Sequence, residues 1–288
     1  MNAELPSDVF ERRFGGLRRL YGVSGSQRIF DAHVVVVGIG GVGSWAVEAL
    51  ARSGVRRLTL IDLDHVSESN INRQIHALEP TLGQAKAEAM RERIALFHPG
   101  CVVDVIDEFV SPDNWPALLH ELPDAEQRPS ALIDACDQLR AKTALAQWAI
   151  SNAIPFVTVG AAGGKRLAQA VEVADLAETT HDPLLAQLRY QLRKHHQGAR
   201  QGRMGVACVF SREAVAPPDA SCAIDGSGNG NGNGNGDTDG SLNCHGYGSA
   251  VSVTATFGMA AAGWVMNALA NPIAKKSTAT QRPATTTL

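Results

Sequence analysis

Apolar runs alternate along the first half of the chain with stretches of helical periodicity. The run VVVVG at 34–38 is continuously apolar and ends in a glycine, which is typical of a buried strand. The stretch after it carries apolar residues spaced for one face of a helix: Trp45, Val47, Leu50 and Ala51. The pattern therefore predicts a strand that leads directly into a helix.

The same alternation continues to about residue 160. Strands are predicted over 56–62, 101–110, 130–137 and 154–164, the last ending in a glycine loop, and helices over 83–98 and 140–153. Strands alternating with helices predict an α/β, Rossmann-like fold with a mainly parallel sheet and helices on both faces. Ligands of such folds bind beyond the carboxyl ends of the strands, where the polar clusters of this chain lie.

The pattern weakens in the second half, which we interpret as a C-terminal extension of the same domain. Residues 13–270 form one domain in this interpretation, with a nucleotide-binding core at 30–160. Residues 182–203 predict a basic helix with a loose tail. The glycine- and asparagine-rich run at 225–240 predicts a flexible loop, and the termini, 1–10 and 272–288, are expected to be disordered.

The segment 249–270 has no charged residue over a length that would just span a bilayer. Its residues are mainly Ser, Thr, Ala and Gly, with little Leu, Ile or Phe. This composition favours a buried helix that packs closely on a sheet, and membrane association of the C-terminus is the alternative.

Composition and charge further limit the classes of protein to which this chain could belong. The formal net charge is −3, so a nucleic-acid partner would have to be met by a local basic patch. The five cysteines form no C-x-x-C pair, which argues against a zinc ribbon, and their odd number argues against a disulfide framework. The first thirty residues are too charged for a signal peptide. We therefore expect a cytoplasmic protein, with peripheral contact to the inner membrane as the alternative.

The glycine loop after the first strand has the spacing G-x-G-x-x-G, formed by Gly38, Gly40 and Gly43, with Gly41 beside them. In such loops the glycines permit the tight turn, the close approach of the phosphates and the contact between helix and strand. Asp62 ends the next strand about 20 residues on, where a carboxylate can bind a ribose. These residues fit NAD and ATP equally well.

The stretch DLDHVSESNINRQ (62–74) distinguishes the two nucleotides, because it adds Asp64, Asn70, Arg73 and Gln74, and Lys86 follows. Cationic side chains suit a site where pyrophosphate leaves a triphosphate, whereas a dinucleotide site has little need of them. Asp137, at the end of a later strand, could hold Mg²⁺ together with the phosphates. Singly, each residue could be a surface charge or, for Asn70, a helix cap. As an ordered set behind a glycine loop, they favour ATP and Mg²⁺.

A second glycine-rich stretch, GAAGGKR at 160–166, is similar to a P-loop but lacks the required spacing. Val159 stands in place of the first glycine, and Arg166 in place of the serine or threonine. We do not expect this stretch to bind phosphate.

Taken together, GIGGVGS, IDLDHVSESNINRQ, Lys86 and DACD resemble the ubiquitin-activating-enzyme-like superfamily, over about 13–160. Its members adenylate a carboxylate with ATP and release pyrophosphate. The resemblance implies that Asp62 binds ribose, that Asn70, Arg73 and Lys86 bind the phosphates, and that Asp137 holds Mg²⁺.

Other segments resemble one family within this superfamily, the bacterial tRNA threonylcarbamoyladenosine dehydratases. These are RFGGLRRLYG (13–22), HDPLLAQLR (181–189), MGVACVFSRE (204–213) and VTATFGM (253–259). The resemblance covers about 13–268 and implies a substrate, the threonylcarbamoyladenosine next to the anticodon of certain tRNAs. Its carboxylate would be adenylated and then closed into a ring by the neighbouring carbamoyl group. No catalytic cysteine is required, so we expect no covalent role for Cys244 and only packing for Cys136.

The resemblance also implies partners. The family pairs its nucleotide domains, so we expect a homodimer in which an N-terminal arginine reaches the partner's ATP. Arg13 is our choice, with Arg12, Arg18 and Arg19 as alternatives. We also expect a sulfur-transfer partner from a cysteine desulfurase system, and we do not expect DNA as a partner.

Three other functions remain as alternatives at this point. An activating enzyme for a ubiquitin-like sulfur-carrier protein is disfavoured by the missing C-x-x-C pairs. A nicotinamide-dependent reductase is disfavoured by the cations of the site, and a non-catalytic nucleotide sensor by the completeness of the phosphate-binding set.

A basic segment is the expected contact for tRNA. Residues 189–203 contain no acidic residue, and they include His195, His196 and the proposed phosphate contacts Arg189, Arg193, Lys194, Arg200 and Arg203. In a helix the first two arginines are i,i+4 neighbours, and a phosphate backbone would relieve their repulsion. The alternative is a solvated basic helix.

Overall fold

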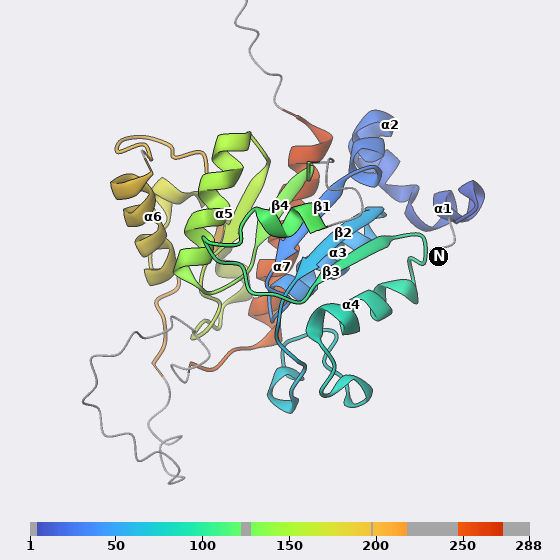
Figure 1. The fold of residues 1–288 in the computed structure, drawn as a ribbon, viewed down its shortest axis with the longest axis horizontal. Helices are drawn as coiled ribbons and strands as arrows, with labels where there is room; N and C mark the ends of the chain where they lie inside the picture. Colours follow the sequence, from blue (N-terminus) through green and yellow to red (C-terminus); the bar gives the residue numbers. More distant parts are fainter. Residues whose placement is uncertain (1–4, 122–127, 197, 218–246, 273–288) are drawn as a thin grey trace, which may run out of the picture.

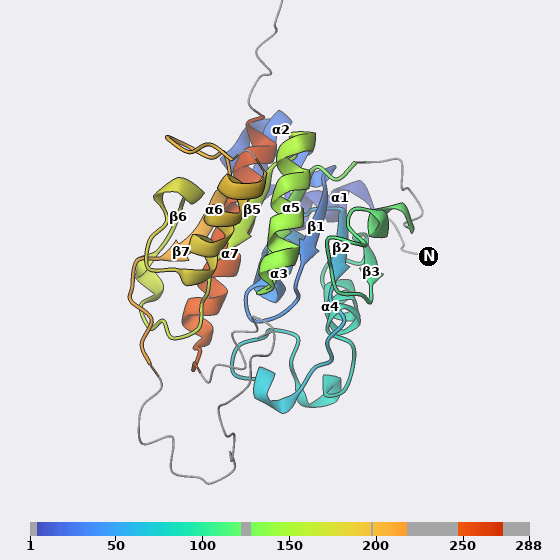
Figure 2. The ribbon, with the colours of Figure 1, turned by 60° about the vertical axis from the view of Figure 1, so that its left-hand side comes forward.

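The structure is a computed structural model that describes residues 5–121, 128–196, 198–217 and 247–272. In this part of the chain, helices cover both faces of a central sheet (Figure 1, Figure 2). The strands are β1 (His33–Val37), β2 (Arg57–Ile61), β3 (Val102–Ile106), β4 (Ala131–Asp134), β5 (Phe156–Val159), β6 (Val171–Asp175) and β7 (Ala207–Ser211). The helices are α1 (Ser7–Phe14), α2 (Gly16–Phe30), α3 (Gly43–Arg52), α4 (Lys86–Ala95), α5 (Leu139–Asn152), α6 (Pro183–His195) and α7 (Val251–Ala270).

The sheet has the order β3-β2-β1-β4-β5-β7-β6, and its β6–β7 pair is antiparallel whereas the other pairs are parallel. Val35 in β1 stands between Thr59 of β2 and Leu132 of β4. The chain leaves β1 toward one edge for β2 and returns to the other side for β4, so the loops after β1 and β4 diverge and open a crevice. The predicted α/β fold with a mainly parallel sheet is confirmed.

Strand residues alternate between two cores. Val34 and Val36 face a core built with α3, α4 and α7, whereas Val35 and Val37 face a core built with α5 and α6. Figures 1 and 2 both place α6 beside α5. The continuously apolar sequence of β1 follows from this, because both faces of the strand are buried.

The sequence pattern does not predict β6 and β7. They form an antiparallel ladder in which Val173 pairs with Val209, although α6 separates them in the sequence. β6 is an edge strand with partly exposed residues, so it lacks the apolar run that marks the central strands. Its pairing depends on a long-range contact that local sequence does not encode.

Two predicted elements are shorter in the structure. The helix expected at 83–98 begins at Lys86, because Gly83 has a φ of +81°, which a right-handed helix does not allow. The strand expected at 101–110 ends at Ile106, the last residue that pairs with β2. Residues 107–110 are thereby free to form part of a cleft.

The expectation that residues 1–10 are disordered is wrong for 7–10, which form the first turn of α1. Phe10 is buried there, with its ring centroid 5.0 Å from that of Phe30 and edge-on to it. This aromatic contact anchors the N-terminal segment to the domain. The loop expected at 225–240 and the tail from residue 273 lie outside the described residues.

α7 is long and apolar enough to cross a membrane, judged by length and composition alone. In the structure Val253, Phe257 and Val265 are completely buried in the core with α3. A Cβ on Gly258 would lie 2.4 Å from the carbonyl oxygen of Val42, so the two helices approach as closely as only a small residue permits. The prediction of a buried, closely packed helix is confirmed.

Candidate active site

A cleft opens at the carboxyl ends of the parallel strands, where the loops after β1, β2, β4 and β5 meet. The cleft is open to solvent and has a cavity volume of about 200 Å³. Most of the predicted site residues line it: Gly38, Gly40, Gly41, Asp62, Asp64, Arg73, Gln74, Lys86 and Asp137. The fold therefore brings together residues that are up to 100 positions apart in the sequence.

The three motif glycines have different roles. Gly38 has a φ of +85°, and a Cβ there would lie 2.8 Å from the backbone of Ala135. A Cβ on Gly43 would lie 1.8 Å from the Gly38 carbonyl oxygen, so the first turn of α3 closes directly on the loop. Gly40 has no atom within 4 Å of its Cβ position, which leaves room for a ligand. The expected turn, helix contact and open approach are all present.

Asp62 braces this loop from the end of β2. One carboxylate oxygen accepts the Ile39 N–H at 2.5 Å, and the other accepts the Asp64 N–H at 2.9 Å. Burial raises the pKa of Asp62, and the charge of Lys86 opposes that rise. The carboxylate therefore faces the cleft with its position fixed by two backbone bonds.

The two cations predicted for the phosphates lie on the same side of the cleft. Lys86 is buried at the start of α4, and its Nζ lies 2.7 Å from Oδ2 of the exposed Asp64. The Arg73 side chain donates to the carbonyl oxygen of Ser69 at 2.5 Å and to Oδ1 of Asn72 at 2.9 Å. Burial lowers the pKa of Arg73. These bonds hold both cations toward the space beside the glycine loop.

Asn70 is the exception among the predicted phosphate contacts. It is buried and is not among the residues that line the cleft. Its Oδ1 accepts the Ser67 N–H at 3.1 Å and closes the turn before Arg73, which is the capping role that the sequence left open. A direct contact between Asn70 and phosphate stays a prediction.

A buried polar network underlies the loop after β4, and sequence reasoning missed it. Lys142 Nζ lies 3.0 Å from Asp134 Oδ2, and both side chains are fully buried. The other Asp134 oxygen accepts the Cys136 N–H at 3.2 Å and its thiol at 3.0 Å. Asp137 follows directly and lines the cleft, so the network positions this carboxylate.

Cys136 also lines the cleft, in surroundings that keep its thiol protonated. Burial raises the pKa of the thiol well above its usual value, and the neighbouring Asp134 carboxylate raises it further. A neutral thiol is a poor nucleophile, so the expectation that Cys136 packs in the wall fits this environment. Cys244 lies outside the described residues.

The donors for a metal are sparse. The described residues contain no group of three or more His, Cys, Asp or Glu side chains that could hold an ion. Mg²⁺ in nucleotide sites needs only one or two carboxylates, because phosphates and water supply the other ligands. Asp137 in the cleft wall fits that requirement as a single protein ligand.

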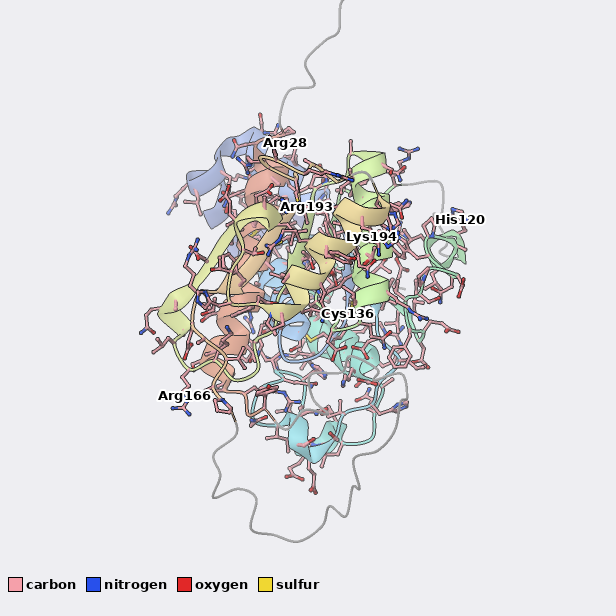
Figure 3. All side chains as sticks on the ribbon, turned by 90° about the vertical axis from the view of Figure 1, so that its left-hand side faces the viewer. Arg28, His120, Cys136, Arg166, Arg193 and Lys194 are labelled. Atoms are coloured by element: carbon pink, nitrogen blue, oxygen red, sulfur yellow. The ribbon has the colours of Figure 1, made fainter. Side chains whose placement is uncertain are left out.

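In the P-loop-like stretch 160–166, the lysine side chain binds backbone carbonyl groups of this chain rather than a phosphate. Lys165 is buried, and its Nζ donates to the carbonyl oxygens of His181, Ser211 and Glu213. The neighbouring Arg166 is exposed and points away from the body of the molecule (Figure 3). Gly160 and Gly163 of this stretch do line the cleft, as part of its far wall.

Sequence reasoning missed several lining residues of the C-terminal half, namely Leu184, Tyr247, Ser249 and Thr254. Tyr247 lies against Gly163 of the far wall, whereas Thr254 lies beside Gly41 and the Ser249 carbonyl oxygen accepts from Asn72, next to the glycine loop and Arg73. Residues 108–110, which follow β3, line the opposite end. Gly246 and Gly248, which flank Tyr247 in the sequence, are typical of a loop and are the one local signal for it. No local signal places that loop beside β5, since the contact joins distant segments.

The N-terminal arginines lie away from the chain's own cleft. Arg13 Nη1 donates to the Phe97 carbonyl oxygen at 2.9 Å, and it is not a lining residue. Arg12 pairs with Asp8 and Arg18 with Glu11. Arg19 is exposed on α2. None of the four reaches the cleft of its own chain, so only a partner's cleft could receive one.

The predicted basic helix is α6, and its cations differ in availability. Arg189 Nη1 donates to the carbonyl oxygens of Leu176 and Thr179, each at 2.9 Å, so it supports the loop before α6. Arg193 donates to Ala199, and Lys194 lies over the ring of Tyr190. Arg200 and Arg203 are exposed. Arg189 is thus a structural residue, whereas the other four cations remain at the surface.

The basic end of α6 points away from the cleft. Leu184 in its first turn lines the cleft, whereas Arg193 and Lys194 lie at the opposite end, above Cys136 (Figure 3). A helix of 13 residues is roughly 20 Å long. A nucleic acid that contacts both the cleft and this patch would have to extend along the helix.

The chain is similar to known proteins over most of its length. The model of the ThiF family matches residues 13–287. The tRNA threonylcarbamoyladenosine dehydratase of Escherichia coli is 45% identical over 271 residues, which cover 93% of this chain and 96% of that protein. The enzyme of the same name from Haemophilus influenzae is 40% identical over 91% of this chain and 95% of its own length.

A solved structure extends the similarity to three dimensions. The crystal structure of the E. coli tRNA N6-threonylcarbamoyladenosine dehydratase in complex with ATP matches with a TM-score of 0.76 and 43% identity. The match covers 92% of this chain and 96% of that chain. The similarity therefore extends beyond the nucleotide-binding half to the C-terminal elements that form the far wall of the cleft.

Proposed function

The chain belongs to the ThiF family, and from this premise we propose that it is an ATP-dependent tRNA threonylcarbamoyladenosine dehydratase. One observation carries the proposal. The cleft combines a glycine loop with Asp62, Arg73 and Lys86, in a chain that matches such a dehydratase over nearly the full length of both. The family gives the carboxylate-activating chemistry, and the full-length match gives the substrate.

The order of the strands predicts how ATP lies in the cleft. Residues 108–110 follow β3, Asp62 follows β2, and the glycine loop follows β1. Since these strands are neighbours in the sheet, adenine, ribose and phosphates would lie over them in that order. The phosphates then reach the amino end of α3 and the side chains of Arg73 and Lys86.

The chemistry begins with the threonyl carboxylate of the substrate. A carboxylate oxygen attacks the α-phosphorus of ATP, the bond to the β-phosphate breaks, and pyrophosphate leaves with its electron pair. Arg73 and Lys86 stabilise the negative charge that develops on the phosphates. The product is an acyl adenylate, in which AMP has become a good leaving group.

Ring closure follows within the same molecule. A nitrogen or oxygen of the neighbouring carbamoyl group attacks the activated carbonyl carbon, a carbamoyl nitrogen loses its proton, and AMP is expelled with the electron pair of the broken bond. The carboxylate oxygen departs as part of AMP, which accounts for the formal loss of water. Because the step is intramolecular, correct positioning of the substrate supplies much of the rate.

Mg²⁺ would be held by Asp137 together with the phosphates of ATP, and it would supply charge neutralisation. The carboxylate of Asp137 lies at the carboxyl end of β4, between the glycine loop and the far wall. Its place above the buried Asp134–Lys142 pair fixes the backbone from which it reaches the cleft.

The partners of the proposal are a tRNA that carries threonylcarbamoyladenosine and a second copy of the chain. A cysteine desulfurase system is a further proposed partner.

We place the protein in the cytoplasm. Its contact with the inner membrane would be peripheral, because the apolar face of α7 packs on α3 and the sheet.

Arg13 is the proposed crossing arginine of the dimer, with Arg12, Arg18 and Arg19 as alternatives, and none of the four lines the cleft of its own chain. Mixed dimers of Arg13→Ala and Arg73→Ala subunits test it, since one of the two sites in each heterodimer would then be intact. Recovery of activity on mixing is expected. Two inactive parents that form heterodimers without recovery would contradict a crossing arginine.

The direct test of the function is release of pyrophosphate from ATP. Modified tRNA should stimulate release, whereas the same tRNA without threonylcarbamoyl and a panel of ubiquitin-like carrier proteins should not. The cyclic nucleoside should appear in digests of the tRNA in proportion to pyrophosphate. Stimulation by a carrier protein instead would establish the alternative, an activating enzyme for a sulfur carrier, although this chain lacks C-x-x-C pairs.

A further inference from the structure

The cleft has a second half that ATP, as laid out above, leaves open. Beyond β4 the lining passes to Gly160 and Gly163, which follow β5, and to Leu184 at the start of α6. Tyr247, in the segment that leads into α7, completes this wall beside Gly163. The carboxylate that accepts the adenylyl group of ATP must lie next to the α-phosphate, so this half is where the substrate nucleoside would lie.

Two aromatic residues are found among the described residues of the cleft, one at each end. Phe109, in the loop after β3, lies at the end assigned to the adenine of ATP. Tyr247 lies at the other end, and a Cβ on Gly163 would be 3.5 Å from its Cβ, which is ordinary van der Waals contact. The reaction brings together two purines, one in ATP and one in the substrate, and the cleft has one aromatic ring for each.

The backbone directly after Tyr247 is held in place by two hydrogen bonds. The Gly248 carbonyl oxygen accepts the Gly164 N–H at 2.8 Å, which ties this segment to the loop after β5. The Ser249 carbonyl oxygen accepts from Nδ2 of Asn72 at 3.1 Å, and Asn72 Oδ1 in turn accepts from Arg73. The segment is therefore tied both to the far wall and to the phosphate-binding arginine.

From this arrangement we infer that Tyr247 is the stacking platform for the modified purine of the substrate, an inference that rests on the proposed function. A base that undergoes chemistry must leave its stack, and an aromatic side chain replaces the lost stacking with neighbouring bases. The hydrogen bond from Asn72 to Ser249, two residues after Tyr247, holds this segment beside Arg73. The threonyl carboxylate, which is attached to that purine, is thereby positioned toward the α-phosphate.

The inference is tested by separating the two substrates kinetically. Loss of one stacking contact costs roughly 5- to 150-fold in affinity. Tyr247→Ala should raise the KM for modified tRNA by that factor while the KM for ATP changes less than about twofold. Tyr247→Phe keeps the ring and should behave as wild type. Phe109→Ala is the matched control, because it should raise the KM for ATP and leave that for tRNA nearly unchanged.

The outcomes separate this inference from the proposed function. Wild-type enzyme that releases no pyrophosphate with modified tRNA overturns the function, and the inference with it. An active wild type together with an unchanged tRNA KM in Tyr247→Ala overturns only the platform. If Tyr247→Phe is as weak as Tyr247→Ala, the hydroxyl group rather than the ring binds substrate, and stacking is overturned. The affinity for ATP is measured for each variant and for Tyr247→Leu, which keeps an apolar side chain without a ring. An ATP affinity equal to that of the wild type verifies that the cleft is folded.

Discussion

The ammonium group of Lys142 lies 3.0 Å from a carboxylate oxygen of Asp134, and no part of either side chain reaches solvent. The same nitrogen donates to Thr158 Oγ1 at 3.1 Å and to the Val159 carbonyl oxygen at 2.8 Å. Burial opposes the charge of Lys142, but attraction to Asp134 more than offsets it, and the pKa of Lys142 is raised. The pair joins α5 to the ends of β4 and β5, directly below the cleft.

Breaking this pair should destabilise the whole domain. Lys142→Met would leave a buried carboxylate without its counter-charge, and we expect a loss of about 3–5 kcal/mol in the free energy of unfolding. Adding Asp134→Leu should recover much of that loss, because no buried charge then remains. Urea denaturation measures both. Arg140→Met, an exposed change in the same helix, is the control, and a Lys142→Met protein as stable as that control would contradict the prediction.

Arg73→Ala should lower the rate of pyrophosphate release by about 100- to 1000-fold, because it removes a positive charge from the leaving phosphates. Circular dichroism should show an intact fold, since the hydrogen bonds that its side chain donates to Ser69 and Asn72 lie within one loop. Arg91→Ala, an exposed arginine of α4 outside the cleft, should keep wild-type turnover. Wild-type turnover in Arg73→Ala would remove it from the phosphate site.

Asp137→Asn should shift the Mg²⁺ dependence of the reaction to higher concentration while nucleoside binding changes little. The change removes the charge of the proposed ligand and keeps its shape, so the metal loses affinity and the cleft keeps its walls. Titration of pyrophosphate release with MgCl₂ gives the midpoint, and AMP binding gives the control. A superimposable Mg²⁺ titration would exclude Asp137 as a ligand.

Replacing Arg193, Lys194 and Arg200 with alanine should weaken binding of tRNA and flatten its dependence on salt. Fewer counterions are released when fewer phosphates are neutralised, so the slope of log affinity against log salt should fall by about 2 to 3. The affinity for ATP should stay unchanged, because Arg193 and Lys194 lie at the far end of α6 from the cleft (Figure 3) and Arg200 does not line the cleft. Identical slopes in both proteins would place the tRNA elsewhere.

Acidification should destabilise the protein through His76. Burial lowers the pKa of His76 to about 4, and the charges of Lys86 and Arg93 lower it as well. The unfolded chain therefore takes up the proton first, and stability that is complete above about pH 6.5 is lost as the pH falls toward 4. The full contribution is on the order of 3 kcal/mol. Thermal melts of His76→Leu between pH 7.5 and 5 should show a smaller decline than wild type.

The control for that experiment is His120→Leu, because His120 lies at the surface on the short helix after β3 (Figure 3). Its melting temperature should fall with pH as steeply as that of the wild type. A His76→Leu protein with the same steep decline would assign the acid sensitivity to other groups, of which buried His98 is the next candidate.

The basic helix shows how far sequence reasoning extends. Charge and periodicity predicted α6 and its cations, but they could not show that Arg189 turns inward to the carbonyl oxygens of Leu176 and Thr179. They also could not show that the basic end points away from the cleft. Both facts depend on how α6 packs on α5 and on the sheet.

The sequence by itself determined the alternating strands and helices of the first half, the glycine loop and most of the residues of the candidate site. Local patterns suffice there, because β1 is a continuous apolar run and several site residues directly follow a strand or begin a helix. Gly38, Asp62 and Lys86 could be placed at one edge for this reason alone, since parallel strands end together.

The tertiary structure alone decided the far wall of the cleft and the support beneath it. Tyr247 meets Gly163, and Asp134 meets Lys142, because β4, β5 and the start of α7 converge at one point. The antiparallel pair β6–β7 closes the sheet beyond them. These contacts join residues that are distant in the chain, and their formation depends on packing of the whole domain, which no local pattern records.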